Sequence, residues 1–519
     1  MVADGVGVGD RVVAWLPNVP ETIIVMLAAA AIGAVFSSTS PDFGAAGVID
    51  RFGQIEPALL IACDGYLYGG KRIELRDRLA EVVRALPSLR RVVVVEHLGD
   101  APRTEGAVSF ADWIAPHTGA ELSTTPLPFD HPWYVLYSSG TTGKPKCIVH
   151  RTGGLLLKHL QEHQLQCDIV PDDRVLYFTT AGWMMWNWLA SVLGSGATVV
   201  LYDGSPFHPS GDLLFDIAES ERLTLLGVSA KFLDSCAKAG VHPINRHDLA
   251  RLRTICSTGS PLSPDGFRYV YEHVKRDVHL SSISGGTDLC GCFVGGDPTG
   301  QVWAGEIQRP VLGMAVDVLV PDGASAPADV AGELICSRSF PSMPLGFWND
   351  DDGSRFRDAY FERFPGRDVW AQGDFASWTS HGGIVVHGRS DTTLNPGGIR
   401  IGTAEIYRIV EQMPEVLESL VFAQQWEGDT RVVLLVRLVG GTVLDVALTE
   451  RIRARVRASA TPRHVPAVIA AVDDLPRTRS NKLVELAVAD IVHGRPVRNT
   501  EAIANPEALD AIAALSELR

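Results

Sequence analysis

The chain has 519 residues, of which 46% are hydrophobic and 21% charged, so it is long enough for two or more domains with large cores. The formal net charge of −15 argues against a general nucleic-acid surface and against binding to an anionic membrane. The longest apolar run, residues 23–36, is too short to span a bilayer, and no basic segment precedes it as in a secretory signal. The eight cysteines are irregularly spaced and contain no C-x-x-C pair, which predicts free thiols in a reducing cytoplasm.

The N-terminal part of the chain alternates between β-prone and helical segments. We expect strands at 11–16, 59–63 and 91–96, with helices at 23–36 and 73–85. This alternation is typical of a parallel sheet covered by helices, so the predicted fold class is α/β with doubly wound sheets. Because only four residues precede the first turn, we also expect the chain to begin inside a fold.

A polar, glycine-containing loop separates two strands that we expect at 133–137 and 147–150. The loop and the lysine after it comprise Ser138, Ser139, Gly140, Thr141, Thr142, Gly143, Lys144 and Lys146. The glycines permit a tight turn, the hydroxyl and N–H groups can cradle phosphate oxygens, and the lysines add positive charge. The spacing is not that of a P-loop, and an ordinary Ser/Gly hairpin is the alternative interpretation.

Two patterns in the next segment have competing interpretations. His159 and His163 lie four residues apart on an expected helix, 155–166, and without the glutamate of H-E-x-x-H they are predicted to be a surface pair rather than metal ligands. Between strands expected at 174–178 and 197–202, three tryptophans occur within six residues. That cluster suits core packing and the wall of a small-ligand pocket equally well.

The rest of the chain divides at a glycine-rich polar stretch, residues 388–402, which is predicted to be a domain linker. Before it, residues 257–262 follow an expected strand at 253–256, at the kind of strand end where α/β proteins bind ligands, although by sequence alone they form only a turn. Cys290 and Cys292 lack the partners that a metal site requires. After the linker we expect a small α+β unit with helices at 403–413 and 449–458 and strands at 419–425, 431–439 and 467–472.

Taken together, these motifs resemble the adenylate-forming superfamily of acyl-CoA synthetases, peptide-synthetase adenylation domains and beetle luciferases. The stretch 134–150 is similar to the phosphate-binding signature of that superfamily, and the resemblance extends from near Arg11 to the C-terminus. It implies a large N-terminal domain, 1–390, of doubly wound sheets plus a small β-barrel, followed by a small, mobile α+β domain, 391–519. A substantial segment normally precedes this point in the superfamily, so the first domain is expected to be truncated at its start.

The resemblance assigns nucleotide contacts outside the phosphate loop. The turn of Gly259, Ser260 and Pro261 matches the one that lines the adenine. Asp374 matches the acid that accepts hydrogen bonds from both ribose hydroxyls, a bidentate role that suits a carboxylate. Arg389 matches a contact to the ribose or a phosphate.

The catalytic residues implied by the resemblance lie in two motifs. In Gly286-Thr287-Asp288 the threonine hydroxyl is expected near the α-phosphate and the acid is expected to serve Mg²⁺, although the superfamily usually has the longer glutamate. Lys482 takes the place of the catalytic lysine. The glycine usual before it is Asn481, a residue that tolerates a left-handed turn.

A hinge and a loop for the thiol step are also implied by the resemblance. Asp391 matches the residue about which the C-terminal domain rotates. Gly397, Gly398 and Arg400 match the loop that moves toward the active site for the second half-reaction.

Within the superfamily, the tryptophan-rich stretch and residues 202–206 resemble the acetoacetyl-CoA synthetase family. The expected acyl pocket therefore includes Trp183, Met184, Trp186, Asn187 and Gly285. Acetyl-CoA synthetases are similar to this chain but have a tryptophan where Gly285 lies, and its loss is expected to leave room for a longer acid.

The expected activity is therefore an acid–thiol ligase that converts acetoacetate, ATP and CoA to acetoacetyl-CoA, AMP and pyrophosphate through an acyl-adenylate, with Mg²⁺. Three alternatives remain open from the sequence. They are a ligase for acetate, propionate or hydroxybutyrate, an adenylation module for a carrier protein, and an inactive truncated nucleotide-binding paralogue. The expected partners are these small molecules, with no nucleic acid and no membrane, and the expected location is the cytoplasm.

Overall fold

The computed structural model describes residues 1–99, 104–138, 145–390, 392, 394, 401–426, 429–460, 464–478, 482–497, 500 and 503–519. The chain divides into two compact units, which are described separately below. The first comprises Met1–Ser138, Lys144–Val316 and Cys336–Asp368, and the second includes Asp317–Ile335 and Val369–Arg519.

The first unit contains an eight-stranded sheet within the described residues, in the order β20-β9-β8-β2-β1-β3-β6-β7. Its pairings are parallel except at β8–β9 and β9–β20, where the strands run antiparallel. The strands are β1 (Arg11–Trp15), β2 (Val35–Thr39), β3 (Leu59–Cys63), β6 (Arg91–Val95), β7 (Ala107–Ser109), β8 (Pro132–Ser138), β9 (Lys146–Arg151) and β20 (Gly346–Phe347). The covering helices include α1 (Pro20–Ala31), α2 (Ala45–Phe52), α3 (Arg76–Ala85) and α4 (Phe110–Ile114), with the hairpin β4 (Gly65–Tyr68) and β5 (Lys71–Glu74) beside them.

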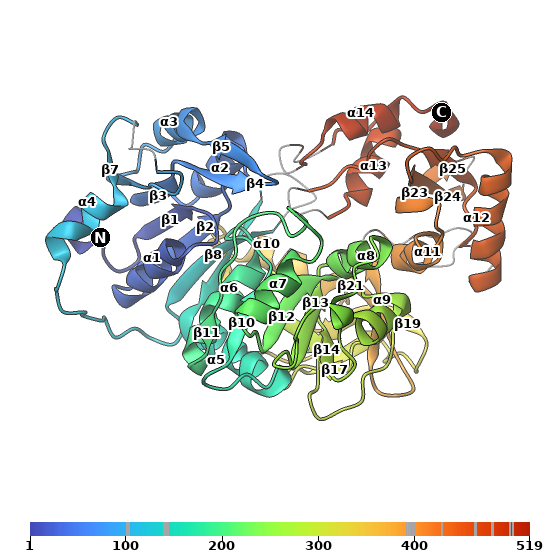
Figure 1. Cartoon of the computed structure of the whole chain (residues 1–519), viewed down its shortest axis with the longest axis horizontal. Coiled ribbons are helices and arrows are strands. Elements are labelled where there is room, and N and C mark those ends of the chain that lie inside the picture. The colour runs from blue at the N-terminus through green and yellow to red at the C-terminus, as the bar shows by residue number, and fades with distance from the viewer. Residues whose placement is uncertain are drawn as a thin grey trace. The chain divides into compact units, whose positions relative to one another are not determined.

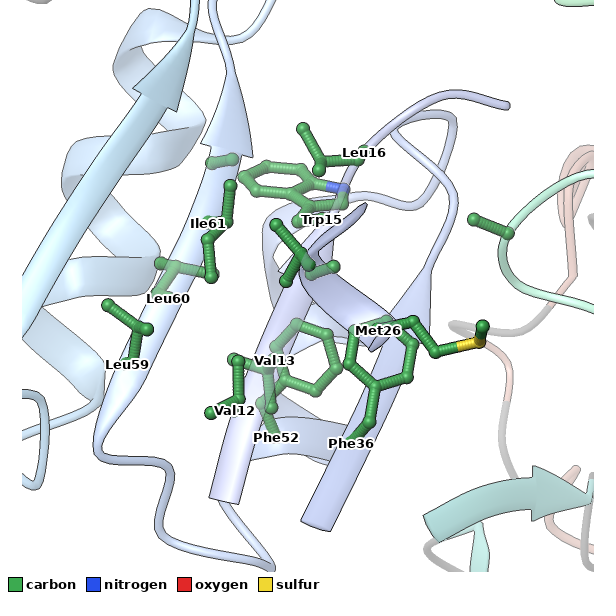
Figure 2. Close-up of a cluster of buried hydrophobic side chains, with 14 of the residues drawn as sticks. Val12, Val13, Trp15, Leu16, Met26, Phe36, Phe52, Leu59, Leu60 and Ile61 are labelled. Atoms are coloured by element: carbon green, nitrogen blue, oxygen red, sulfur yellow. The ribbon is translucent and has the colours of Figure 1, made fainter. Parts of the chain in front are cut away.

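The core of this sheet forms because the inner strands β1 and β3 are apolar on both faces, as expected of a covered parallel sheet. Figure 2 shows Phe36 and Phe52 close to Val12 and Val13 of β1, with the side chains of β3 on the neighbouring strand. Trp15 is fully buried, and its indole N–H donates to the Ser40 carbonyl at 3.1 Å. Each large apolar side chain buried in this way stabilises the fold by about 2 kcal/mol.

The helix expected at 23–36 is shorter than the apolar run that predicted it. It begins at Pro20, a favoured first-turn residue, and ends at Ala31. Gly33 then adopts a left-handed φ of 76°, which breaks the helix and lets the last part of the run enter β2. Apolar content alone could not separate a buried helix from a buried strand in this run.

A second sheet in the first unit has five parallel strands among the described residues, in the order β11-β10-β12-β13-β14. They are β11 (Thr198–Val199), β10 (Arg174–Tyr177), β12 (Leu225–Ser229), β13 (Thr254–Thr258) and β14 (His279–Ser282). Its helices are α7 (Leu213–Ser220), α8 (Ala230–Lys238) and α9 (Pro264–Tyr269), which Figure 1 shows next to the strands. Since all five strands are parallel, the loops after β12, β13 and β14 leave from one edge.

Helix α5 (Thr152–Gln161) continues into a π-helical turn, Glu162–Gln166, and α6 (Met184–Ala190) follows β10. The prediction of a surface pair at His159 and His163 is wrong, because both side chains are fully buried. Each ring has a polar partner in the interior, which sequence spacing could not reveal. The remaining strands and the remaining α-helix among the described residues of this unit are β15 (Ser284–Gly286), β16 (Gly291–Gly295), β17 (Arg309–Pro310) and α10 (Ser354–Tyr360).

The second unit contains two sheets within the part of the chain that the structure describes. Where the resemblance implies a small β-barrel, the structure has a four-stranded sheet of β18 (Val316–Leu319), β19 (Ala331–Cys336), β21 (Trp370–Trp378) and β22 (Ile384–Arg389). The expected α+β unit follows, with a sheet of β23 (Val416–Trp426), β24 (Asp429–Leu438) and β25 (Val468–Ala471). Its helices are α11 (Thr403–Val410), α12 (Val446–Ser459), α13 (Glu485–Val492) and α14 (Glu507–Ala513). The mixed α/β class, with a large N-terminal and a small C-terminal part, is confirmed.

Across the described residues, none of the helices combines the length and the apolar character that crossing a membrane requires.

Candidate active site

Two of the predicted nucleotide loops leave the same edge of the five-stranded sheet. The Gly259–Pro261 turn follows β13, and the residues from Gly285 to Asp288 follow β14. The strands hold these loops together, because the Ile283 N–H donates to the Ser257 carbonyl at 2.9 Å and the Thr258 hydroxyl donates to the Ile283 carbonyl at 3.1 Å. The carboxyl edge of a parallel sheet is where α/β proteins bind ligands, so the fold supplies a common platform for both loops.

Gly285 lies in a hairpin that leaves no room for a side chain. A Cβ atom at this position would lie 2.0 Å from the Gly291 carbonyl oxygen and 2.6 Å from the Cys292 Cα. The direction in which a side chain would leave Gly285 is therefore filled by the backbone of β16. The glycine permits the close β15–β16 approach, a reason for its presence that sequence reasoning did not include.

Lys146 and Asp288 are connected through Tyr360, a residue that sequence reasoning missed. The Tyr360 hydroxyl donates to Asp288 Oδ1 at 2.5 Å, and the Lys146 ammonium lies 5.3 Å from the centre of the Tyr360 ring. Phe347 supplies a second aromatic face at 5.6 Å from the ammonium. These contacts bring the predicted phosphate-binding lysine and the predicted metal-binding carboxylate into one cluster. Ser138 lies opposite Lys146 in the β8–β9 ladder.

His150, at the end of β9 that leads away from the loop, is another polar residue that sequence reasoning did not select. Its ring is buried beside the Thr287 backbone. Burial lowers the pKa of His150 to about 3, and the Thr287 backbone opposes that shift only in part. The imidazole is therefore neutral beneath the predicted catalytic threonine at neutral pH.

In the tryptophan-rich segment, some side chains are fully buried in the core and others are only half-buried. Trp186 is fully buried, packs near Phe36 and donates its indole N–H to Asn18 Oδ1 at 3.0 Å. Asn187 is also buried, whereas Trp183 and Met184 remain half-buried. Composition left core packing and pocket wall equally open, and the burial assigns Trp186 to the core. The acyl-pocket role of the segment stays a prediction.

In the second unit, Asp374 and Arg389 face each other in the β21–β22 ladder. Asp374 is buried and accepts from Arg389 Nη1 at 3.3 Å and from the Gln372 amide at 2.9 Å. Gly373 has a φ of 87°, and a Cβ atom there would lie 2.7 Å from the Arg389 guanidinium. Gly373 thus adopts a left-handed backbone conformation and leaves space for the Arg389 side chain. As a result, the Asp374 carboxylate and the Arg389 guanidinium lie side by side.

Lys482 lies in the second unit and is exposed. The Lys482 N–H donates to the Thr478 hydroxyl at 3.1 Å, and the Thr478 N–H donates to the Lys482 carbonyl at 2.8 Å. Arg477, one residue before Thr478, is anchored by an ion pair with Glu418. The motif therefore holds the lysine backbone firmly while its side chain reaches solvent.

Several predicted residues lie outside the described part of the chain. These are Ser139, Gly140, Thr141, Thr142, Gly143 and Lys144 of the phosphate loop, and Asp391, Gly397, Gly398 and Arg400 of the hinge and thiol loop. Their roles stay predictions.

The chemistry of the described residues fits a magnesium ion that reaches the protein with a nucleotide. No group of three or more His, Cys, Asp or Glu side chains among the described residues forms a metal cage. Mg²⁺ commonly needs only one or two carboxylates, because substrate phosphates and water complete its coordination. Asp288, half-buried and oriented by Tyr360, is a donor of this kind.

Comparison with protein families gives the class of protein that this fold and site define. Residues 1–348 match the family described as AMP-binding enzyme, and residues 405–482 match the AMP-binding enzyme C-terminal domain. A solved structure of an anthranilate CoA ligase in complex with anthranoyl-AMP has the same fold, with a TM-score of 0.79 at 20% identity, covering 93% of this chain and 87% of the other.

More similar relatives narrow the family. An acetoacetyl-coenzyme A synthetase of Rhizobium meliloti is 58% identical over 100% of this chain and 79% of its own length, and one of Gallus gallus is 45% identical over 99% and 78%. The structure of an acetoacetyl-CoA synthetase from Streptomyces lividans matches with a TM-score of 0.92 and 44% identity, covering 99% of this chain and 78% of the other. The chain therefore belongs to the acetoacetyl-CoA synthetase family of AMP-binding enzymes.

Proposed function

We propose that this protein is an ATP-dependent acid–thiol ligase that converts acetoacetate, ATP and CoA to acetoacetyl-CoA, AMP and pyrophosphate. The observation that carries the proposal is the 58% identity to an acetoacetyl-coenzyme A synthetase along the whole chain. The cluster of Lys146, Tyr360 and Asp288 supports it, because a cation and a carboxylate in one cluster suit the binding of a magnesium–nucleotide triphosphate.

In the first half-reaction the acetoacetate carboxylate attacks the α-phosphate of ATP, and pyrophosphate leaves with the electrons of the broken P–O bond. Such a step depends on positioning and on neutralising the charge of the phosphates. In our proposal Lys146 and the loop from Ser138 hold the departing pyrophosphate, Thr287 contacts the α-phosphate, and Lys482 stabilises the charge on the transferring group. Asp288 would hold Mg²⁺, which supplies neutralisation of phosphate charge when bound.

In the second half-reaction the CoA thiolate attacks the acyl carbon of the adenylate, and AMP leaves. Asp374 and Arg389 would hold the ribose and its phosphate through both steps, and Asp391 would act as the hinge between them. We place this chemistry in the cytoplasm, because all eight cysteines are free thiols, as a reducing compartment maintains them.

The proposal is tested by measuring pyrophosphate release from MgATP with acetoacetate, acetate, propionate or 3-hydroxybutyrate, with and without CoA. We expect the fastest release with acetoacetate and a loss of about a hundredfold or more in Lys482→Ala, because one group that stabilises transition-state charge is removed. Lys482 is exposed, so the variant should fold normally, and its unfolding midpoint is the control. Absence of release with every acid from folded protein that binds ATP would contradict a ligase. Faster release with another acid would contradict acetoacetate.

A further inference from the structure

The end of α5 and the π-helical turn after it carry a polar face that is sealed inside the first unit. Lys158, His159, Glu162 and His163 are each no more than 2% exposed. Lys158 Nζ and Glu162 Oε1 form an ion pair at 3.2 Å. Taking a charged pair out of water is costly, and apolar residues of the same volume are often no less stable, so the pair calls for an explanation other than stability.

One side of this face holds the strand that follows the predicted catalytic residues. Glu162 Oε1 accepts from the Cys292 N–H at 2.8 Å, and His159 Nε2 donates to the Cys290 carbonyl at 2.7 Å. Cys290 has a φ of 46°, a conformation that few residues other than glycine adopt. Asp288 lies two residues before it, and its carboxylate has a separate partner in the Tyr360 hydroxyl, at 2.5 Å.

The other side of the same face holds α6, the helix of the tryptophan-rich segment. Trp188 donates its indole N–H to Glu162 Oε2 at 2.9 Å, and His163 Nε2 donates to the Trp188 carbonyl at 3.0 Å. His159 Nδ1 lies 2.9 Å from the hydroxyl of Ser191, just beyond the end of α6.

Glu162 is therefore bound through one carboxylate oxygen to β16 and through the other to α6. A carboxylate suits this position because each oxygen can accept strong hydrogen bonds, and Lys158 balances its charge. Gly291 leaves the necessary space, since a Cβ atom there would lie 2.9 Å from Glu162 Oε1 and 3.2 Å from Lys158 Cε. The hairpin that contains Gly285 thus rests directly on the ion pair.

We propose that Glu162, balanced by Lys158, is a positioning residue that sets the spacing between the Gly285–Asp288 loop and helix α6, and thereby the selectivity of the enzyme for its acid substrate. This inference rests on the proposed function, because it concerns the acid side of the same site. It predicts that loss of the charged pair changes recognition of the acid much more than recognition of ATP.

The test compares wild-type enzyme with Glu162→Gln and with the double variant Lys158→Met/Glu162→Gln. The single variant leaves Lys158 buried without its countercharge and can fail to fold. The double variant removes both charges of this pair, and its glutamine has one accepting oxygen for two donors, the Cys292 N–H and the Trp188 indole N–H. Measurements are the unfolding midpoint, the KM values for acetoacetate and for ATP, and the ratio of kcat/KM for acetoacetate over acetate.

Asp173→Asn is a matched control in the same unit. Asp173 is a buried carboxylate that pairs with Arg253 at 2.8 Å and accepts a backbone N–H from Val170 at 2.9 Å. It precedes β10, at the edge of the five-stranded sheet opposite to the predicted nucleotide loops. Its loss should lower stability without changing the choice of acid.

We expect the folded double variant to raise the KM for acetoacetate about tenfold, to change the KM for ATP less than about threefold, and to lower the acetoacetate-to-acetate ratio about tenfold. Unchanged KM values and an unchanged ratio would overturn the proposal. It would also be overturned if Asp173→Asn raised the KM for acetoacetate much more than the KM for ATP. If wild-type enzyme prefers another acid, the proposed substrate is wrong, and the same comparison on that acid still decides the role of Glu162.

Discussion

At the scale of single residues, Tyr360 connects two groups with separate predicted tasks, phosphate binding by Lys146 and metal binding by Asp288. Its hydroxyl donates to Asp288, and its ring faces the Lys146 ammonium. A short hydrogen bond to a carboxylate fixes the direction of the remaining lone pairs, which are the ones available to a metal ion or to water. Tyr360 is therefore expected to orient Asp288 without touching the substrate.

Tyr360→Phe should raise the KM for MgATP and lower kcat/KM about tenfold, because a hydrogen bond to a charged group is lost while the ring over Lys146 is kept. Pyrophosphate release at several Mg²⁺ concentrations measures this. Tyr269→Phe is the control, since this residue ends α9 and its buried hydroxyl donates to the Val241 carbonyl at 2.8 Å, in an apolar core that α8 and α9 share. An unchanged Mg²⁺ dependence in Tyr360→Phe would show that Asp288 does not need this bond.

At the scale of elements, β9, α5 and the π-helical turn after α5 place three histidines in the interior. Burial lowers the pKa values of His150, His159 and His163, because the charged imidazolium is poorly solvated there. The folded pKa of His150 is about 3, below the ordinary value of 6.5 that the unfolded chain retains. Below pH 6.5 the unfolded chain therefore binds a proton that the folded protein excludes. The contribution of the neutral His150 ring to the free energy of unfolding is complete above pH 6.5 and is lost as the pH falls toward 3.

The free energy of unfolding should thus fall between about pH 7.5 and about pH 5, with about 2 kcal/mol of the loss due to His150 alone. Urea unfolding at the two pH values measures it. In His150→Gln the loss should shrink by that amount, whereas His117→Gln, at an exposed position, should behave as wild type. An equal loss in wild type and His150→Gln would contradict the burial of a neutral imidazole.

At the scale of the whole molecule, our proposal gives the two half-reactions different arrangements of groups around one substrate. The predicted hinge Asp391 supplies that change in our proposal. Proline fixes φ near −65°, so a proline at a hinge should favour one arrangement over the other.

Asp391→Pro should leave acetoacetate-dependent pyrophosphate release within about threefold of wild type and should slow thioester formation about tenfold or more. Single-turnover assays of the two half-reactions separate these effects. Asp391→Ala does not fix the backbone angle φ and should retain the rates of both half-reactions. A proline variant with the wild-type rate of thioester formation would contradict a hinge at this position.

Local sequence patterns were sufficient to predict most elements near the site. The strands on both sides of the phosphate loop, β8 and β9, lie where apolar and β-branched runs predicted them. The same reasoning extended one helix to residue 36, because a continuous apolar run has no period that separates a buried helix from a buried strand. Gly33 marked the true boundary, but only its backbone angle reveals this.

The sequence by itself determined the family and the ordered motifs, because the predicted phosphate loop, the predicted adenine turn and the motif before Lys482 are each made of residues adjacent in the chain. Only the tertiary structure decided which distant residues serve them. Tyr360 reaches Asp288 across 72 positions, and Glu162 reaches Cys292 across 130. Such contacts leave no period or spacing in the sequence, since they arise from the packing of separate elements. The burial of the Lys158–Glu162 ion pair could not be predicted from the sequence for the same reason.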